Sequence, residues 1–278
     1  MRWPAASTEP PDWPTVEEIV TFCAEMIIDG EPDEIRAALR RLMLTSELLG
    51  SDPLEHWEQE RRDTRLLTRP LVVGADMRSA IMPWAIESTY RVYLRYISDG
   101  RLPWTRNTTP PQVLTAMDAY RQRRNNELED EVHDRVAELG YPNRKRIRTN
   151  KARSIGLQHL SGEIDEILAD PQRNAIWVLE VKDPQEAFSP RQLSNGIDDF
   201  TGTATREGYV SKLLRKVSDV SVDPVAVASA LGVDEPNREW TVRPAMVTRR
   251  PIAAAFANTG APFATVDEIA EMISPSPS

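Results

Sequence analysis

The sequence is poor in the residues that hold soft metals and disulfides. Its 278 residues include one cysteine, Cys23, and three histidines, His56, His133 and His159, which are far apart. A single cysteine excludes an internal disulfide framework and a thiolate metal cluster. The scattered histidines argue against zinc hydrolases of the HExxH type and against nucleases with a histidine general base. A metal site in this chain would therefore use oxygen ligands and a hard cation.

Long hydrophobic runs are also missing. No stretch approaches the roughly 18 to 20 consecutive apolar residues that a membrane helix needs, and we find no signal-peptide pattern at the N-terminus. Hydrophobic residues make up 40% and charged residues 28% of the chain, which is typical of a soluble globular protein. We therefore expect a cytoplasmic protein that has no membrane partner.

The first lysine of the chain is Lys145, and the net charge is −9. An acidic total counts against a broad nucleic-acid-binding surface. Residues 141 to 153, however, contain six basic side chains and no acidic one. These are Arg144, Lys145, Arg146, Arg148, Lys151 and Arg153. Such a cluster would bind a nucleic-acid backbone by counterion release, or it is a solvated loop. Lys212, Arg215 and Lys216 either extend this surface or form a charged helix face.

Helical patterns fill the first 110 residues. Capping residues and apolar stripes predict four helices, which span 15–28, 32–49, 51–65 and 78–98. The proline-rich stretch 101–111 is typical of a linker. The sequence therefore predicts an all-α N-terminal domain, residues 1–110, that packs or recognises a protein partner. The alternative is a phosphate-binding role for its arginines Arg61, Arg62, Arg65 and Arg69.

From residue 111 to 278 the pattern is mixed. Helices are expected at 112–139, 189–217 and 267–273, and strands at 144–148, 162–169, 175–182, 240–248 and near 263–265. The order α-β-β-β-α-β-β-α predicts an α/β fold, with a mixed central sheet flanked by helices.

Charged residues occur where two of these strands begin and end. Alternation places Glu163 and Asp165 on one face of the strand 162–169. The strand 175–182 is apolar almost throughout, and Glu180 and Lys182 lie two apart on one face at its end. Burying these charges is costly unless they are paired or bind a metal. The alternatives are solvent-facing acids on an edge strand and a surface ion pair.

The helix 112–139 offers one more acidic candidate. Its apolar stripe includes Leu128, Val132, Val136 and Leu139, and Glu129 lies about 60° from the centre of that stripe. Glu129 is therefore the acid in this region that is best placed to point toward the sheet. A solvated helix acid is the other interpretation.

These motifs resemble a known family. The sequence Gly-Glu-Ile-Asp at 162–165, followed by Glu-Val-Lys at 180–182, resembles the signature of the PD-(D/E)xK, or restriction-endonuclease-like, nuclease superfamily. The resemblance covers roughly residues 120 to 278 and includes the helix before the first motif. One departure is that Ile164 stands where the family name has proline.

The resemblance implies a restriction-endonuclease-like core with a metal-dependent site. Asp165 and Glu180 would bind Mg²⁺ or Mn²⁺, with Glu129 and Glu163 as further ligands. Lys182 would be the catalytic lysine that positions or deprotonates the attacking water.

The same resemblance implies hydrolysis of phosphodiester bonds, in DNA rather than RNA. Gln192, in the stretch that resembles the following helix of the family, would face the site. Many such nucleases pair to cut two strands, so a homodimer is one expectation, and host defence or mobile-element biology is the expected setting. Two alternatives stay open: a catalytically inactive nucleic-acid-binding or assembly module with the same fold, and a non-nuclease structural protein.

Overall fold

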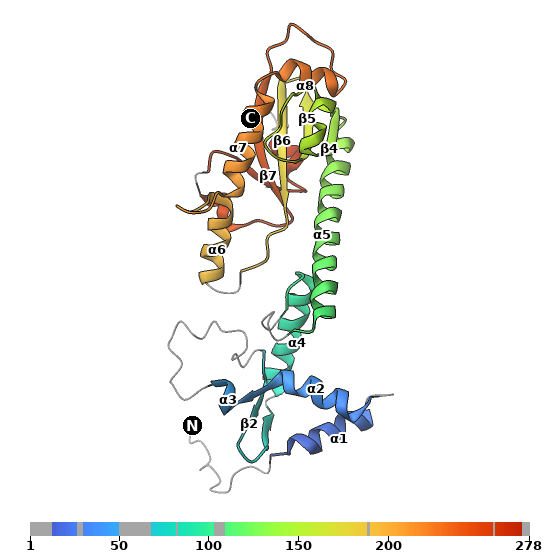
Figure 1. Cartoon of the computed structure of the whole chain (residues 1–278), viewed down its shortest axis with the longest axis vertical. Coiled ribbons are helices and arrows are strands. Elements are labelled where there is room, and N and C mark those ends of the chain that lie inside the picture. The colour runs from blue at the N-terminus through green and yellow to red at the C-terminus, as the bar shows by residue number, and fades with distance from the viewer. Residues whose placement is uncertain are drawn as a thin grey trace, which may run out of the picture. The chain divides into compact units, whose positions relative to one another are not determined.

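The computed structural model describes residues 13–26, 30–49, 68–81, 83–102, 109–187, 190–257 and 259–273. The chain divides into two compact units, Met1–Ala119 and Tyr120–Ser278. The division falls within the long helix α5 (Pro111–Glu138), whereas the sequence placed it at residue 110. Each unit is described by itself below (Figure 1).

The first unit contains a small sheet as well as helices. Its helices are α1 (Val16–Met26), α2 (Pro32–Leu42), α3 (Ser46–Leu49) and α4 (Pro83–Ser98). Its strands are β1 (Met43–Thr45), β2 (Leu71–Val73) and β3 (Ser79–Ile81), in the order β1-β2-β3. β1 and β2 are parallel, and β2 and β3 are antiparallel. The prediction of an all-α domain is therefore wrong.

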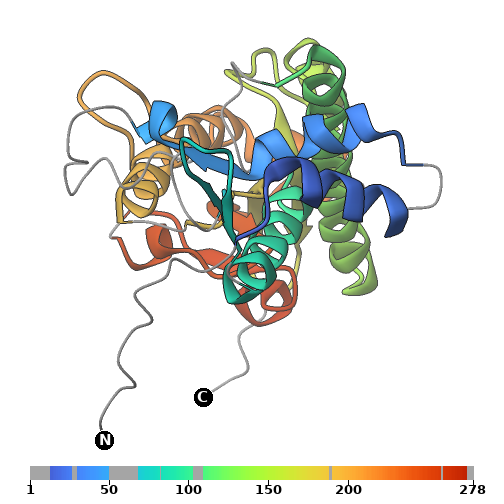
Figure 2. The ribbon, with the colours of Figure 1, turned by 90° about the horizontal axis from the view of Figure 1, so that it is seen from below.

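The small sheet explains why the expected helix 32–49 is interrupted. The helical pattern ends at Leu42, and the next residues pair with β2, so that Met43 lies opposite Leu71. This pairing joins segments far apart in the chain, which local periodicity does not reveal. Figure 2 shows α1 and α2 lying side by side, and Val20 and Ile35 from these helices share a buried cluster with Leu71.

The start of α1 follows the predicted capping box. The Thr15 hydroxyl accepts a hydrogen bond from the Glu18 backbone N–H (3.2 Å), and the Glu18 carboxylate accepts one from the Thr15 N–H (2.7 Å). The two residues thereby satisfy donors that a helix leaves free at its N-terminus. The predicted helix 51–65 lies outside the described residues.

Arg69 has a structural role in this unit. Its side chain is buried, and its Nη1 donates to the backbone oxygens of Arg40 (3.2 Å), Arg41 (3.1 Å) and Met43 (3.0 Å). These carbonyls lie at the end of α2, where a helix leaves its acceptors without partners. The hypothesis that Arg69 contacts phosphate is therefore wrong. Its expected companions, Arg61, Arg62 and Arg65, lie outside the described residues.

The second unit is built on a five-stranded mixed sheet in the order β4-β5-β6-β7-β8. The strands are β4 (Asn143–Ile147), β5 (Ile164–Asp170), β6 (Ala175–Lys182), β7 (Thr241–Thr248) and β8 (Phe263–Thr265). β4, β5 and β6 are antiparallel neighbours, and β6, β7 and β8 are parallel neighbours. The predicted α/β class with a mixed sheet is confirmed.

Helices cover both faces of this sheet, with α5 and α7 (Tyr209–Val220) on opposite sides (Figure 1). On one face, Leu128, Val132 and Val136 of α5 share a buried cluster with β6 and with α9 (Ile269–Ile273). On the other face, the cluster includes residues of α6 (Pro190–Thr201), α7 and α8 (Pro224–Ala230). None of the described helices combines the length and the apolar character needed to cross a membrane.

The expected helix 189–217 is in fact two helices, α6 and α7. Gly202, which follows α6, has a φ of +87°, a left-handed conformation that glycine adopts without steric cost. A Cβ atom at Gly208, just before α7, would collide with the Phe200 carbonyl oxygen. The chain therefore turns between these glycines, and the short helix α8, which the sequence did not predict, follows α7.

A buried carboxyl group lies between α5 and the sheet. The Glu166 side chain on β5 is fully buried, and its Oε2 lies 3.1 Å from Nδ1 of His133 on α5. Burial raises the pKa of Glu166 to about 8, against the opposing attraction of Lys145. Burial also lowers the pKa of His133. Near neutral pH, burial therefore favours the uncharged forms of both the Glu166 carboxyl group and the His133 imidazole.

We expect Glu166→Gln to stabilise the protein in a pH-dependent way. Because the folded state holds a proton on Glu166 up to about pH 8 and the unfolded state releases it near pH 4.5, stability falls as the pH rises between these values. Because the amide of the variant does not ionise, this loss of stability disappears, and the free energy of unfolding at pH 9 should rise by up to about 5 kcal/mol. Urea denaturation at pH 4 and pH 9 measures the difference, and an equal effect at both pH values would contradict the burial of an ionisable group here.

Replacement of Arg69 should loosen the first unit. Arg69→Met leaves three carbonyls at the end of α2 without this donor and is expected to lower the free energy of unfolding by about 2 to 4 kcal/mol. Arg91→Met is the matched control, because Arg91 forms an exposed pair with Glu87 and its loss should change stability by less than about 0.5 kcal/mol. Chemical denaturation followed by tryptophan fluorescence compares them; equal stabilities would refute the capping role.

Candidate active site

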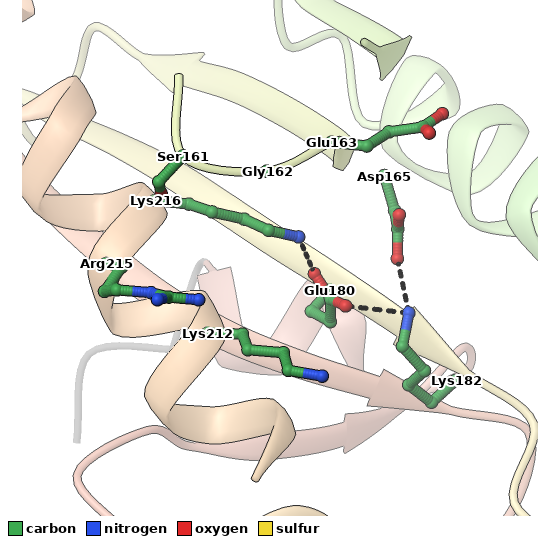
Figure 3. Close-up of a pocket in the computed structure, with 9 residues that line it drawn as sticks. All are labelled: Ser161, Gly162, Glu163, Asp165, Glu180, Lys182, Lys212, Arg215 and Lys216. Carbon is green, nitrogen blue, oxygen red and sulfur yellow. Dashed lines mark hydrogen bonds and ion pairs between the residues drawn. The ribbon is translucent and has the colours of Figure 1, made fainter. Parts of the chain in front are cut away.

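A pocket of about 300 Å³ opens in the second unit where β5 begins and β6 ends. Its lining comes from the loop 161–163, from β5 and β6, and from one side of α7 (Figure 3). The register places Glu166 opposite Leu179, so Asp165 and Glu180 come from facing positions on adjacent antiparallel strands. Three carboxylates and four cationic side chains line this one pocket.

The structure brings Asp165, Glu180 and Lys182 together. Nζ of Lys182 lies 3.0 Å from Oδ2 of Asp165 and 2.8 Å from Oε1 of Glu180, so one ammonium bridges two carboxylates (Figure 3). The Val181 backbone N–H also donates to Oδ2 of Asp165, at 2.8 Å. Within the described part of the chain, no hydrogen bond is directed at Oδ1 of Asp165, which leaves that oxygen available as an acceptor.

A second ammonium reaches Glu180 from α7. Nζ of Lys216 contacts Oε2 of Glu180, and both side chains are buried, with 8% and 6% of their surface exposed. The sequence offered Lys216 only as part of a charged surface, and that interpretation is wrong. A signal was present: Lys216 lies between Leu213 and Val220 on the buried stripe of an amphipathic helix.

The electrostatics of the two carboxylates differ because Glu180 has two ammonium partners and Asp165 has one. Burial raises the pKa of Asp165, the Glu180 charge adds to this effect, and Lys182 acts against it. Burial also acts to raise the pKa of Glu180, but attraction to Lys182 and Lys216 outweighs burial and lowers it. Burial acts to lower the pKa of Lys182, but the two carboxylates outweigh burial and raise it, so Lys182 keeps its proton near neutral pH and acts as a hydrogen-bond donor.

The remaining cations of the pocket lie on the exposed side of α7. Nζ of Lys212 lies 5.6 Å from the centre of the Tyr209 ring, and Arg215 pairs with Glu207 at 3.0 Å. The chain contains only five lysines. Three of them, Lys182, Lys212 and Lys216, line this pocket.

Glu163 lines the pocket but stands apart from the other two carboxylates. Its side chain is exposed, and Figure 3 shows its carboxylate directed away from Glu180. The Glu163 charge contributes to the raised pKa of Arg146, which indicates that the two side chains are close. Glu163 is therefore placed at the rim of the pocket.

Glu129 is not brought to the pocket. It lies on α5, which covers the face of the sheet opposite to Lys216 and α7, and its Oε2 accepts a hydrogen bond from Nε of Arg146 at 2.6 Å. Arg146 has a φ of +52°, an uncommon conformation for a residue other than glycine. Its contacts with Glu129 and with the Asn126 carbonyl (3.0 Å) offset that strain. The role of Glu129 as a metal ligand stays a prediction that this geometry does not favour.

The basic run 144–153 is divided between paired and exposed side chains. Lys145 pairs with Asp130 at 2.9 Å, and Arg144 donates to the Ser154 carbonyl at 2.5 Å. Arg148 and Lys151 are exposed. Acids of α5 thus neutralise part of the cluster, which the local sequence could not indicate because those acids precede it by 15 residues or more. Gln192 is half-buried on α6 and does not line the pocket.

The pocket offers the carboxylate oxygens that a hard cation binds, although it contains few carboxylates. Among the described residues, no group of three or more histidine, cysteine, aspartate or glutamate side chains is placed to hold a metal ion. Asp165 and Glu180 nevertheless converge on one point, which the Lys182 ammonium occupies, and Oδ1 of Asp165 keeps its acceptor capacity. Two carboxylates with water completing the shell are a common arrangement for Mg²⁺. The residues present therefore fit such an ion, with few protein ligands.

Removal of Lys182 tests this charge arrangement without reference to activity. Lys182→Met leaves two buried carboxylates side by side and should lower the free energy of unfolding by about 3 kcal/mol at pH 8. The loss should be smaller at pH 5, because the carboxylates then have a raised pKa in the folded state and take up a proton. Asp165→Asn in the same chain should restore part of the stability. The exposed Lys151→Met is the control in urea denaturation; equal losses for the two methionine variants would exclude the bridging role.

No protein-family model, curated protein or solved structure matches this chain. Its function is therefore inferred from the geometry of the pocket and from the residues that line it.

Proposed function

We propose that the second unit is a Mg²⁺- or Mn²⁺-dependent nuclease of the PD-(D/E)xK type with a restriction-endonuclease-like core. The observation that carries this proposal is the convergence of Asp165, Glu180 and Lys182 from two neighbouring strands within 3.0 Å contacts. The order of the elements, a helix, three antiparallel strands, further helices and two parallel strands, agrees with the expected core.

In this proposal Asp165 and Glu180 hold the metal ion. When bound, the ion polarises the scissile phosphate and lowers the pKa of a water molecule. With the ion held by these carboxylates, the Lys182 ammonium would no longer lie between them, and its Nζ would donate a hydrogen bond to the attacking water or to a phosphate oxygen. Lys182 holds its proton near neutral pH, which favours a role as donor and electrostatic stabiliser over that of general base.

The open side of the pocket fits an anionic strand. Lys212 is exposed there and contacts the Tyr209 ring, and Arg215 keeps an exposed pair with Glu207 that an incoming phosphate can replace. Arg148 and Lys151 supply further exposed positive charge. DNA is the proposed substrate. The first unit is proposed to recognise a partner protein, and pairing of two chains would allow cleavage of both strands.

A second candidate is a nucleic-acid-binding or assembly module with the same fold and no turnover. The observation that favours it is that lysines already pair with both carboxylates. A protein of this kind would bind DNA with a strong salt dependence and leave it intact.

The deciding experiment is a cleavage assay on circular duplex DNA with Mg²⁺, with Mn²⁺ and with a chelator. We expect cleavage only with a divalent ion, and a rate at least about 100-fold lower for Asp165→Ala and for Lys182→Ala, because each removes a charged group at the reacting phosphate. Asp267→Ala, an exposed aspartate beside α9, is the matched control and should cleave as the wild type does.

DNA retention measured in parallel separates the two candidates. Cleavage by the wild type together with its loss in both variants supports the nuclease. Salt-dependent DNA binding without cleavage in either metal supports the inactive module. Cleavage that persists in Asp165→Ala would refute the proposed site, and the same assay with single-stranded RNA tests the preference for DNA.

A further inference from the structure

Lys216 is the least exposed cation of the pocket, and its side chain reaches Glu180 from the other layer of the fold. Its Nζ contacts Oε2 of Glu180, whereas Lys182 takes Oε1, so each oxygen of this carboxylate has its own ammonium (Figure 3). Only 8% of the Lys216 side chain is exposed. Burying a lysine at such a position costs free energy unless the ammonium is paired, so the role of Lys216 depends on its pairing with Glu180.

Two features of the loop before β5 keep Lys216 in place. A Cβ atom at Gly162 would lie 3.1 Å from Cε of Lys216, so the missing side chain leaves room for the lysine stem. The Ser161 backbone N–H donates to the carboxylate of Asp219 at 2.7 Å, which ties the loop to α7 less than one turn after Lys216. The loop and the helix therefore form one support around the ammonium.

A fixed ammonium on Glu180 has a direct effect on any cation that this carboxylate holds. A divalent ion bound to Glu180 would stand a few ångströms from Nζ of Lys216, and like charges at such distances repel strongly in a partly buried site. Lys182 differs from Lys216 in its freedom to move. Its ammonium bridges the two carboxylates at the open end of the pocket, and 27% of its side chain is exposed. Lys216 is enclosed and has less room to move away.

We propose that Lys216 is a positioning residue that competes with the divalent ion for Glu180 and keeps the affinity of the pocket for free metal low. The ion is then held firmly only when the negative charge of a phosphodiester shares it. This inference depends on the proposed function in one respect, namely that Asp165 and Glu180 are the metal ligands.

The test is a calorimetric titration of the full chain with Mn²⁺ alone, without DNA. Lys216→Met keeps the apolar stem and removes the charge, and it should raise the Mn²⁺ affinity at least about tenfold. Lys216→Arg keeps the charge and should bind Mn²⁺ as weakly as the wild type. A lysine that only supports the fold would give the opposite sign, because its loss would loosen the pocket and weaken binding.

Lys212→Met is the matched control on the same helix. It removes an exposed ammonium of the same pocket, whose charge is screened by solvent, and should change the Mn²⁺ affinity much less than Lys216→Met. Gly162→Ala is the second variant, since its Cβ pushes the Lys216 stem and should raise the affinity in the same direction by a smaller factor. If circular dichroism shows that Lys216→Met does not fold, the Mn²⁺ affinity of Gly162→Ala tests the role of Lys216 in its place.

The outcomes separate this inference from the proposed function. Equal or weaker Mn²⁺ binding by folded Lys216→Met, with a wild type that binds, overturns the role of Lys216 and leaves the nuclease proposal standing. Binding by Lys216→Met alone supports the competition and leaves the nuclease proposal standing, because the wild-type pocket is then expected to hold the ion only together with a phosphodiester. No binding by either protein overturns the role of Lys216, and the cleavage assay with divalent ions then tests the nuclease proposal by itself.

Discussion

Burial of the Glu180 carboxylate is the constraint on which the rest of the pocket depends. The carboxylate ends a strand that is covered by helices on both faces, and it can stay there only with positive partners. Lys182, two residues further along the same strand, supplies one partner, and Lys216 on α7 supplies the other. The facing strand then adds Asp165, whose oxygen shares the Lys182 ammonium. A single buried charge thus requires a specific helix, a specific strand register and a loop with glycine at position 162.

The two faces of the sheet have separate tasks. Trp177, Leu179 and Val181 of β6 point toward α5 and form an apolar cluster with it. The alternate residues Glu180 and Lys182 point toward α7. Because successive side chains of a strand point to opposite faces, one short segment both anchors the long helix and supplies the polar groups of the pocket. The same alternation leaves Glu166 on the α5 side, where burial favours its neutral form beside His133.

Several features followed from local patterns. The strands expected at 162–169 and 175–182 and the stripe of Leu128, Val132 and Val136 follow from patterns within a few residues, and the structure contains them as β5, β6 and the buried side of α5. Glu163, which the alternation placed on the strand with Asp165, lies just before β5 instead. The pairing of β1 with β2 and the break between α6 and α7 were missed. The first depends on a partner 28 residues away, and the second on glycines whose backbone conformation is set by the chain around them.

By itself the sequence determined the α/β class of the second unit, the strands that carry Asp165, Glu180 and Lys182, and the hard-oxygen character of any metal site, because periodicity and residue chemistry are local properties. Only the tertiary structure decided which charges meet. It directed Lys216 to Glu180, gave Glu129 and Lys145 ion-pair partners beside the helix α5, and made Arg69 a cap for α2. The reason is that ion pairs form between charged groups that are close in space, and the packing of the helices on the sheet sets those distances.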